Sequence, residues 1–487
     1  MDREPLSRAD YALFRMDLPE NRMVVTALLT FKTPVLLEQL KAELTNSLLE
    51  IPRFRQRIVL PQSLWSNAYW QDDPVFDLDR HIIRIQTPLP KNPDLLKEVV
   101  SRIMTLGIDS SHPLWQFYLI ERYGKGSALV ARMHHAIADG ISLVKVLLSV
   151  THADPFPSTN QTFTLPLQPF KPSKTSSVDL KKPDAQILGQ VSASGRRALI
   201  EVGALEDAFR LSASTLAALG RLLLSPADAE NTFRGQTRVA KRAAWSPDLE
   251  LNQVKQVGKI FGATINDVLI SATTGAIRRY VLERTNGQNH PGLHSFVPVD
   301  LRRDTRRESA RFLLGEPVDE SLGNRFGFAV PRLPVNIADP VRRLKAVHRL
   351  MDRHKASGEA VVSYLVLTVL GAVPGEIENL AARFWLTKGS AVMTNVAGPR
   401  HPLYLAGSEI DTMIGWVPAS GAVGLGVSIF SYYGNVLLGI ASDENLVPDP
   451  ERIIEFFLEE YHTLEQKATH MRSNGAVSDK ADNSNDG

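Results

Sequence analysis

A proline-rich segment near the middle of the chain limits the folds that this sequence can adopt. Six prolines lie among serines, threonines and lysines between Pro155 and Pro183, where no hydrophobic periodicity is present. Such a composition favours a linker or an extended crossover over a helix or a central strand. On both sides of this segment, apolar runs of strand length alternate with runs whose apolar residues recur at helical spacing. The sequence therefore predicts two mixed α/β halves joined by a crossover.

The boundaries of the two halves follow from the same pattern. The first half takes residues 1–151, and residues 152–235 hold the crossover together with a leucine-rich helix predicted at 187–225. The second half takes residues 236–466, and the polar residues 467–487 are expected to form a disordered tail. The clearest local elements predicted are strands at 24–32, 127–133, 390–396 and 423–431, helices at 247–261, 265–285 and 339–357, and a hairpin turn at Tyr433-Gly434-Asn435.

The composition excludes several classes of protein. The chain contains no cysteine, which excludes a disulfide framework, a thiolate metal site and a cysteine nucleophile. Its 55 basic residues nearly balance 53 acidic ones, so a nucleic-acid partner is not expected. No apolar run is long enough to span a bilayer, and the charged N-terminus lacks an apolar signal segment. We therefore expect a cytoplasmic protein that reaches a membrane only by docking on its surface.

The strongest chemical feature is the segment HHAIADG, from His134 to Gly140, which follows an apolar strand-like run. Neighbouring residues of an extended segment point to opposite faces, so one histidine can enter a cavity while the other packs behind it. This geometry argues against a shared metal ion, and imidazole titrates near neutral pH, as a general base must. Asp139 can orient the turn that Gly140 permits. A packing or surface role for both histidines is the alternative.

The HHAIADG segment resembles the H-H-x-x-x-D-G motif of the chloramphenicol-acetyltransferase-like, or condensation, superfamily. Further segments resemble the bacterial wax ester synthase/diacylglycerol acyltransferase (WS/DGAT) family, in the same order, over about residues 4–465. The D-F-G-W-G motif of the plant BAHD acyltransferases is absent from the sequence. The segments that carry the resemblance are residues 4–32, FDLDRH at 76–81, Pro113-Leu114-Trp115, Asn266-Asp267-Val268, SLGNRFG at 321–327 and TNVAGP at 394–399.

This resemblance implies a mixed α/β (α+β) fold in which two acetyltransferase-like subdomains form a pseudo-dimer around a central tunnel. Acyl-coenzyme A would enter as a substrate, so neither a cofactor nor a metal is implied. His135 would take the proton from the acceptor hydroxyl, which attacks the thioester directly. His134 would orient the site, and Asp139 would support the motif structurally through an arginine. The products would be triacylglycerol from diacylglycerol, wax esters from fatty alcohols, or both.

The resemblance also suggests residues for substrate binding. Asn266 would donate to the oxyanion or position a substrate, although an Asn-Asp pair before an apolar run is also typical of a helix N-cap. Arg302 and Arg303 would bind coenzyme A phosphates, or they belong to a solvated loop with its own acidic partners. The remaining positions implied to bind substrate are Pro113, Leu114, Trp115, Asp267 and Asn395, with packing as the alternative for the first three.

The protein would associate peripherally with a membrane or lipid-droplet surface, as a monomer or a homodimer. Two other functions stay open. One is a condensation-superfamily acyltransferase that uses a different acceptor, and the other is a non-catalytic lipid-binding protein of lipid droplets.

Overall fold

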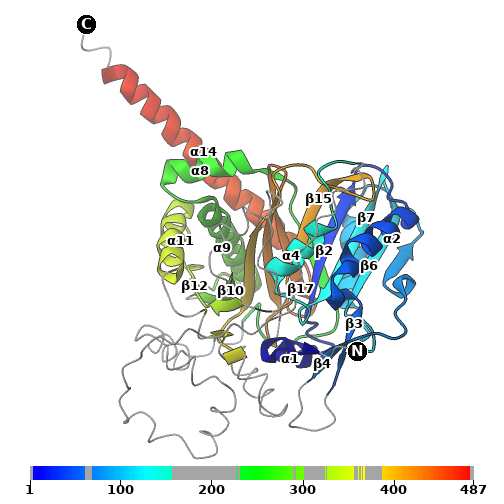
Figure 1. Cartoon of the computed structure of the whole chain (residues 1–487). Helices are drawn as coiled ribbons and strands as arrows, with labels where there is room; N and C mark the ends of the chain where they lie inside the picture. The colour runs from blue at the N-terminus through cyan, green and yellow to red at the C-terminus, as the bar shows by residue number, and fades with distance from the viewer. Residues whose placement is uncertain are drawn as a thin grey trace, which may run out of the picture.

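The computed structural model describes residues 4–60, 68–155, 228, 231–288, 292–300, 324, 326–355, 360, 363–364, 366–367, 387–419 and 421–482. The helix predicted at 187–225 and the pair Arg302 and Arg303 lie outside these residues. The described part is built around two large sheets, and helices cover the outer face of one of them (Figure 1).

Strands and helices are interspersed along the described part of the chain. In the first part they are β1 (Glu4–Pro5), α1 (Arg8–Arg15), β2 (Val24–Phe31), α2 (Leu37–Asn46), β3 (Gln56–Val59), β4 (Tyr69–Asp72), β5 (Ile82–Ile85), α3 (Pro93–Thr105), β6 (Trp115–Tyr123), β7 (Gly126–His134) and α4 (Gly140–Ser149). After the proline-rich segment they are β8 (Lys241–Trp245), β9 (Leu249–Glu250), α8 (Leu251–Phe261), α9 (Ile265–Arg284), β10 (Leu293–Asp300), β11 (Phe326–Ala329), β12 (Arg332–Leu333), α11 (Pro340–Lys355), β13 (Ala391–Ala397), β14 (Tyr404–Leu405), β15 (Ser408–Trp416), β16 (Leu425–Tyr432), β17 (Asn435–Asp443) and α14 (Pro450–Asp482).

Strand β7 lies at the centre of the first sheet and carries the histidine motif at its end. The sheet has the order β14-β15-β2-β7-β6-β5, and every residue of β7 is buried. Such a strand reads as a continuous apolar run because both of its faces are covered. Its first residue must be glycine, since a Cβ on Gly126 would lie 1.9 Å from the carbonyl oxygen of Phe31. Pairing with β2 and β6 and this close approach therefore fix the position of the strand that carries the motif.

The first sheet is not made by the first half of the chain alone. Strand β15 pairs antiparallel with β2, with Gly415 opposite Ala27 and Ile414 opposite Leu28. The division into one subdomain at 1–151 and another at 236–466 is therefore inexact, because β14 and β15 leave the second half and complete the sheet of the first. The sequence does not reveal this exchange, because the residues of a strand do not identify a pairing partner nearly 400 residues away.

The second sheet has the path β11-β10-β13-β16-β17-β8, with β9 and β12 attached at its margins. Helices α8, α9, α11 and α14 pack together against it (Figure 1). Every residue of helix α9 from Asp267 to Ile277 is buried, so the helix has no clear amphipathic face and forms the centre of the second core. This arrangement confirms the expectation of a mixed α/β fold.

Helix α14 extends beyond the body of the protein. It continues to Asp482 and projects outward (Figure 1), so the expectation of a disordered tail from residue 467 is wrong up to that residue. Extending a docked helix costs less than starting a new one, and this explains why a polar sequence can continue it. Among the described residues, no single helix has both the length and the apolar character to cross a membrane. Helices α8 and α9, bent by 92°, meet those criteria only as a pair.

Candidate active site

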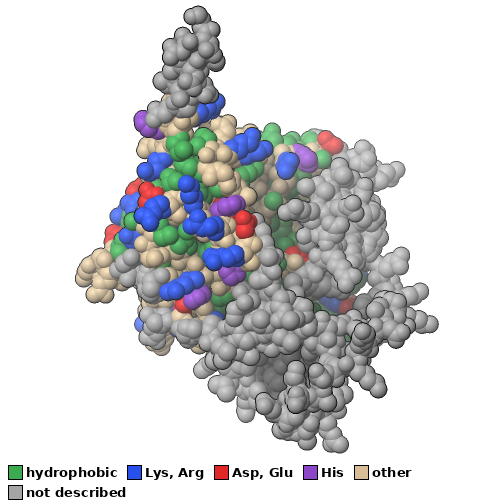
Figure 2. All heavy atoms as spheres, turned by 90° about the vertical axis from the view of Figure 1, so that its left-hand side faces the viewer, with side chains coloured by type: hydrophobic (Ala, Val, Ile, Leu, Met, Phe, Trp, Pro, Cys, Tyr) green, Lys and Arg blue, Asp and Glu red, His purple; other side chains and the backbone are tan. Residues whose placement is uncertain are grey.

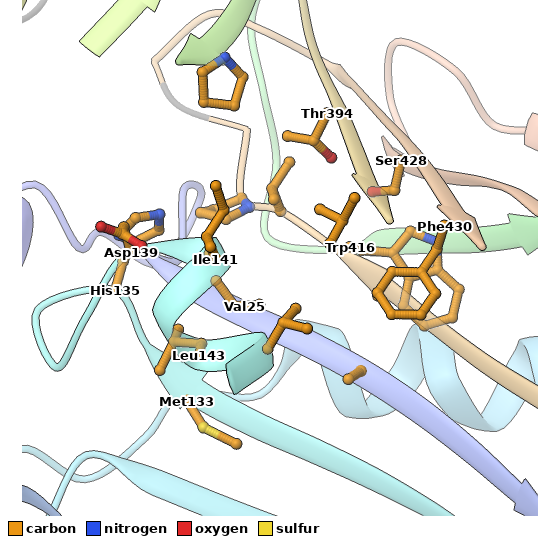
Figure 3. A pocket seen from close by; sticks show the side chains of 18 of the residues that line it. Val25, Met133, His135, Asp139, Ile141, Leu143, Thr394, Trp416, Ser428 and Phe430 are labelled. Carbon is orange, nitrogen blue, oxygen red and sulfur yellow. The ribbon is translucent and has the colours of Figure 1, made fainter. Parts of the chain in front are cut away.

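The histidine motif forms the turn between β7 and α4. The backbone N–H of His134 donates to the carbonyl of Leu114 at 2.9 Å, and that of His135 donates to the carbonyl of Met23 at 2.7 Å. These bonds to two neighbouring segments fix the backbone where the strand ends. The side chain of His135 lines a cavity (Figure 3), with its ring centroid 5.3 Å from that of Phe326.

Asn324 holds the imidazole of His135 from the other half of the chain. Its Oδ1 lies 2.9 Å from His135 Nδ1, and its Nδ2 donates to the backbone carbonyl of His135 at 2.7 Å. The same Nδ2 donates to Asp10 Oδ1 at 2.6 Å, and the backbone N–H of Asn324 donates to that oxygen at 3.0 Å. Three segments that are distant in sequence therefore meet in one buried network.

This network fixes which nitrogen of His135 carries the proton. The amide Nδ2 of Asn324 faces two acceptors, a carboxylate and a backbone carbonyl, so the orientation of the amide is determined. Its Oδ1 can only accept, and His135 Nδ1 must therefore donate to it. A neutral imidazole then has its lone pair on Nε2. Nε2 is consequently the nitrogen available to act as a base.

His134 has the opposite arrangement. Its Nδ1 accepts from the backbone N–H of Ala136 at 3.0 Å, so Nδ1 is unprotonated and already occupied. Its Nε2 carries the proton and lies 3.7 Å from Asp17 Oδ1. His134 and His135 therefore differ in tautomer, and the imidazole of His134 has no free lone pair. The geometry gives His134 a supporting role in the turn.

Burial sets the charge state of the network. Loss of hydration lowers the pKa of His135 below its ordinary value, so the imidazole is neutral at neutral pH. Burial raises the pKa of Asp10, although hydrogen bonds from Ser7 and Asn324 oppose this effect. A neutral His135 with its lone pair on Nε2 is the form that a general base requires.

Asp139 and Gly140 shape the start of α4 beside His135. Asp139 is the N-cap of α4, and its Oδ1 accepts from the backbone N–H of Ser142 at 2.9 Å. Both Asp139 and Gly140 also line the cavity. The aspartate of the motif therefore supports the structure through a helix cap, a role that short acidic side chains perform at helix starts.

The cavity lies where the two sheets meet. Its walls come from β2, β7, β15 and α4 on one side and from β10, β11, β13 and β16 on the other. Most side chains that line it are aliphatic or aromatic, among them Val25, Met133, Leu143 and Phe430 (Figure 3). An apolar cavity with one histidine in its wall fits a long hydrocarbon substrate.

The Asn266-Asp267 pair does not have the geometry that the sequence suggests. The N-cap of α9 is Thr264, so the expectation that Asn266 caps this helix is wrong. Asp267 forms the capping box with Thr264, and its Oδ2 lies 2.8 Å from His348 Nδ1. Asn266 Oδ1 accepts from Asn395 Nδ2 at 2.6 Å, and of these residues only Asn395 lines the cavity. Asp267 therefore supports the helix, while Asn266 contacts the site through Asn395.

Leu114 and Trp115 belong to the core of the first half, and Pro113 beside them is buried. None of the three lines the cavity. Trp115 Nε1 donates to the carbonyl of Phe54 at 2.9 Å, and the Trp115 ring stacks on His81 at 4.4 Å. His81 ends the FDLDRH segment, so two of the segments that carry the resemblance pack on each other. The structure supports the packing alternative for this group.

The residues that sequence reasoning missed are Asn324 and Asp10. Asn324 lies in SLGNRFG and Asp10 in the opening segment, so both belonged to quoted stretches, although neither was singled out. Their partners are 189 and 314 residues away along the chain. No local pattern reports a contact of that range.

Comparisons with solved structures define the class of protein. The first condensation domain of the CDA synthetase matches with a TM-score of 0.56 and 14% identity, covering 94% of this chain and 96% of that domain. The wax ester synthase/diacylglycerol acyltransferase from Marinobacter aquaeolei matches with a TM-score of 0.65 and 20% identity, covering 96% and 100%. The fold is that of the condensation, or chloramphenicol-acetyltransferase-like, class.

Comparisons of sequence define the family. The model of the wax ester synthase/diacylglycerol acyltransferase catalytic domain matches residues 6–269, and that of the WS/DGAT C-terminal domain matches residues 322–465. A Mycobacterium tuberculosis protein named "Probable diacyglycerol O-acyltransferase tgs1" is 27% identical over 453 residues, covering 91% of each chain. A second, named tgs2, is 26% identical over 429 residues, covering 85% of this chain and 87% of its own. This chain belongs to the WS/DGAT family of acyltransferases, which confirms the resemblance.

Proposed function

We propose that this chain transfers a long-chain acyl group from acyl-coenzyme A to the hydroxyl of a diacylglycerol or a fatty alcohol, with His135 as the general base. The observation that carries the proposal is the clamp of Asn324 on His135. It leaves the lone pair on Nε2 of a neutral imidazole that lines an apolar cavity. The family to which the chain belongs supports the choice of acyl donor and acceptor.

The proposed reaction proceeds by direct attack. His135 Nε2 takes the proton of the acceptor hydroxyl while its oxygen attacks the thioester carbonyl. The tetrahedral intermediate then breaks the carbon–sulfur bond, and the imidazolium returns the proton to the departing thiolate. The products are an ester and free coenzyme A, and no cofactor is needed. General-base assistance of this kind contributes roughly 10²–10⁴-fold.

The walls of the cavity would supply much of the remaining acceleration. A dry, apolar cavity holds two hydrocarbon chains in line and excludes water, whose attack would waste the thioester. We propose that this cavity is part of a tunnel between the two subdomains, with coenzyme A at one face and the acceptor at another. Arg302 and Arg303 stay candidates for the phosphates of coenzyme A.

The proposal includes peripheral association with a membrane or lipid-droplet surface. Lys and Arg side chains gather over the face that includes α11 (Figure 2). Four of them, Arg342, Lys345, Arg349 and Arg353, recur along α11 and are exposed. Basic side chains on one side of a helix favour contact with anionic lipids. All proposed reacting groups lie within one chain, so a monomer or a homodimer would suffice.

The experiment supplies purified wild type and His135→Ala with palmitoyl-coenzyme A and either dioleoylglycerol or hexadecanol. Thiol release and the lipid product are followed together. The proposal is supported if wild type forms the ester and the folded His135→Ala variant does not. Coenzyme A binding without ester formation would favour a different acceptor. If wild type shows no turnover and does not bind acyl-coenzyme A, the result would favour the non-catalytic lipid-binding protein.

A further inference from the structure

Three buried polar side chains lie in the cavity apart from the histidine motif. They are Thr394, Trp416 and Ser428, which expose 5%, 1% and 4% of their surfaces. The other polar side chains that line the cavity are His135 and Asp139 of the motif and the more exposed Asp300 and Asn395. Figure 3 shows Thr394 and Ser428 together, across the cavity from His135.

The second sheet places Thr394 and Ser428 on one face, and Trp416 of β15, in the first sheet, lies beside them. Thr394 of β13 and Ser428 of β16 are register partners in a parallel pair, and Ser428 is opposite Gly439 of β17. Paired residues of neighbouring strands point to the same face of a sheet. A Cβ on Gly439 would lie 2.8 Å from Trp416 Nε1, so the indole N–H occupies the space that the glycine leaves beside Ser428.

The hydrogen-bonding capacity of these three side chains is largely unused. Within the described ranges, Trp416 Nε1 and Ser428 Oγ have no hydrogen-bond partner. Thr394 Oγ1 makes a long contact of 3.5 Å with the carbonyl of Val427. Buried donors are normally satisfied, and unsatisfied ones in a native fold call for a ligand or a solvent partner. Because an indole N–H can only donate, the matching ligand atom must be an acceptor.

We propose that Thr394, Ser428 and Trp416 form a subsite that binds an ester carbonyl of a diacylglycerol acceptor. The inference rests on the acyl transfer proposed above and names the acceptor class that this site distinguishes. A fatty alcohol has one polar atom, its hydroxyl, which the reaction places at His135 together with the thioester carbonyl. A diacylglycerol carries two further ester carbonyls. The subsite therefore recognises diacylglycerol and not a simple alcohol.

The test compares two acceptors with the same acyl donor. Ser428→Ala and Trp416→Phe each remove one donor while they keep most of the packing. The measured quantity is the ratio of kcat/KM for dioleoylglycerol to kcat/KM for hexadecanol, with palmitoyl-coenzyme A. We expect this ratio to fall about tenfold in each variant, the effect of one lost hydrogen bond in a buried site. Ser295→Ala is the matched control, because Ser295 is a buried serine of the same sheet outside the cavity, and its ratio should match wild type.

Equal losses with both acceptors would assign the subsite to the acyl donor or to the transition state, and would overturn the inference. An unchanged ratio without any loss would overturn it as well. A second measurement needs no turnover. Radiolabelled dioleoylglycerol in mixed micelles should bind wild type without acyl-coenzyme A about tenfold more tightly than Ser428→Ala. Equal binding would contradict the subsite. Absence of ester formation in wild type, by contrast, marks failure of the proposed reaction itself.

Discussion

Replacing Asn324 by alanine tests how the fold prepares His135 for the proposed role as general base. The change removes the acceptor for His135 Nδ1–H, the donor to the His135 carbonyl and the side-chain donor to Asp10. These three contacts measure between 2.6 and 2.9 Å, and all lie in the buried network. The imidazole is then free to rotate or to exchange its tautomer, and both changes remove the lone pair from its working position.

The magnitude follows from the contacts that are lost. An unsatisfied buried donor costs about 1–3 kcal/mol, which corresponds to roughly 5- to 150-fold in an equilibrium or a rate. We therefore expect kcat to fall roughly 10- to 100-fold in Asn324→Ala, less than the ~10²–10⁴-fold of losing the base itself. The three lost bonds together should lower the free energy of unfolding by about 3 kcal/mol.

The assay follows thiol release and ester formation at saturating substrates, with unfolding in denaturant measured in parallel. On a His135→Ala background, Asn324→Ala should lower the rate no further, because both changes remove the same function. Asp10→Asn keeps an acceptor oxygen for Asn324 and should lose less activity than Asp10→Ala. A folded Asn324→Ala enzyme whose kcat stays within about twofold of wild type would refute the reasoning about the tautomer.

Three further predictions concern pH, a helix cap and a core residue. Because burial lowers the pKa of His135, kcat/KM should stay level at neutral pH and fall only below the ordinary histidine value of 6.5; a limb centred above that value would contradict it. Below about pH 6.5 the unfolded chain binds a proton at His135 that the folded chain does not, so stability should decrease as pH falls, and less so in His135→Ala. Asp139→Ala should lower the free energy of unfolding by about 1 kcal/mol in denaturant titrations, since the bond to Ser142 N–H is lost, and an equal loss in Asp139→Asn would argue against capping. Trp115→Ala should lower the free energy of unfolding by about 3–5 kcal/mol and leave the pH dependence of kcat/KM unchanged. An altered KM at unchanged stability would instead show that Trp115 binds substrate.

Local patterns in the sequence were sufficient for most elements. The strand predicted at 24–32 is β2, and the helices predicted at 265–285 and 339–357 are α9 and α11 within one or two residues at each end. The hairpin at Tyr433-Gly434 is confirmed, since both residues have positive φ angles, 45° and 82°, as a two-residue hairpin loop of this twist requires. The apolar run that precedes His134 was sufficient to predict that the histidine motif lies at the end of a strand.

Contacts between distant segments could not be predicted in this way. The pairing of β15 with β2 and the clamp of Asn324 on His135 depend on the tertiary fold, which places them together. The error about Asn266 has a different cause. The pattern Thr264-Ile265-Asn266-Asp267 itself contains the capping box, in which Thr264 and not Asn266 is the cap.

The protonation of the two adjacent histidines tests the central claim most directly. In the ¹⁵N spectrum of the imidazole nitrogens, assigned with His135→Gln and His134→Gln, the account predicts that neutral His135 carries its proton on Nδ1 and His134 on Nε2. The predicted His135 signal should also stay neutral at pH values where an exposed histidine is already charged. A His135 that carries its proton on Nε2, or that is charged at neutral pH, could not accept a proton from a lipid hydroxyl and would contradict the mechanism.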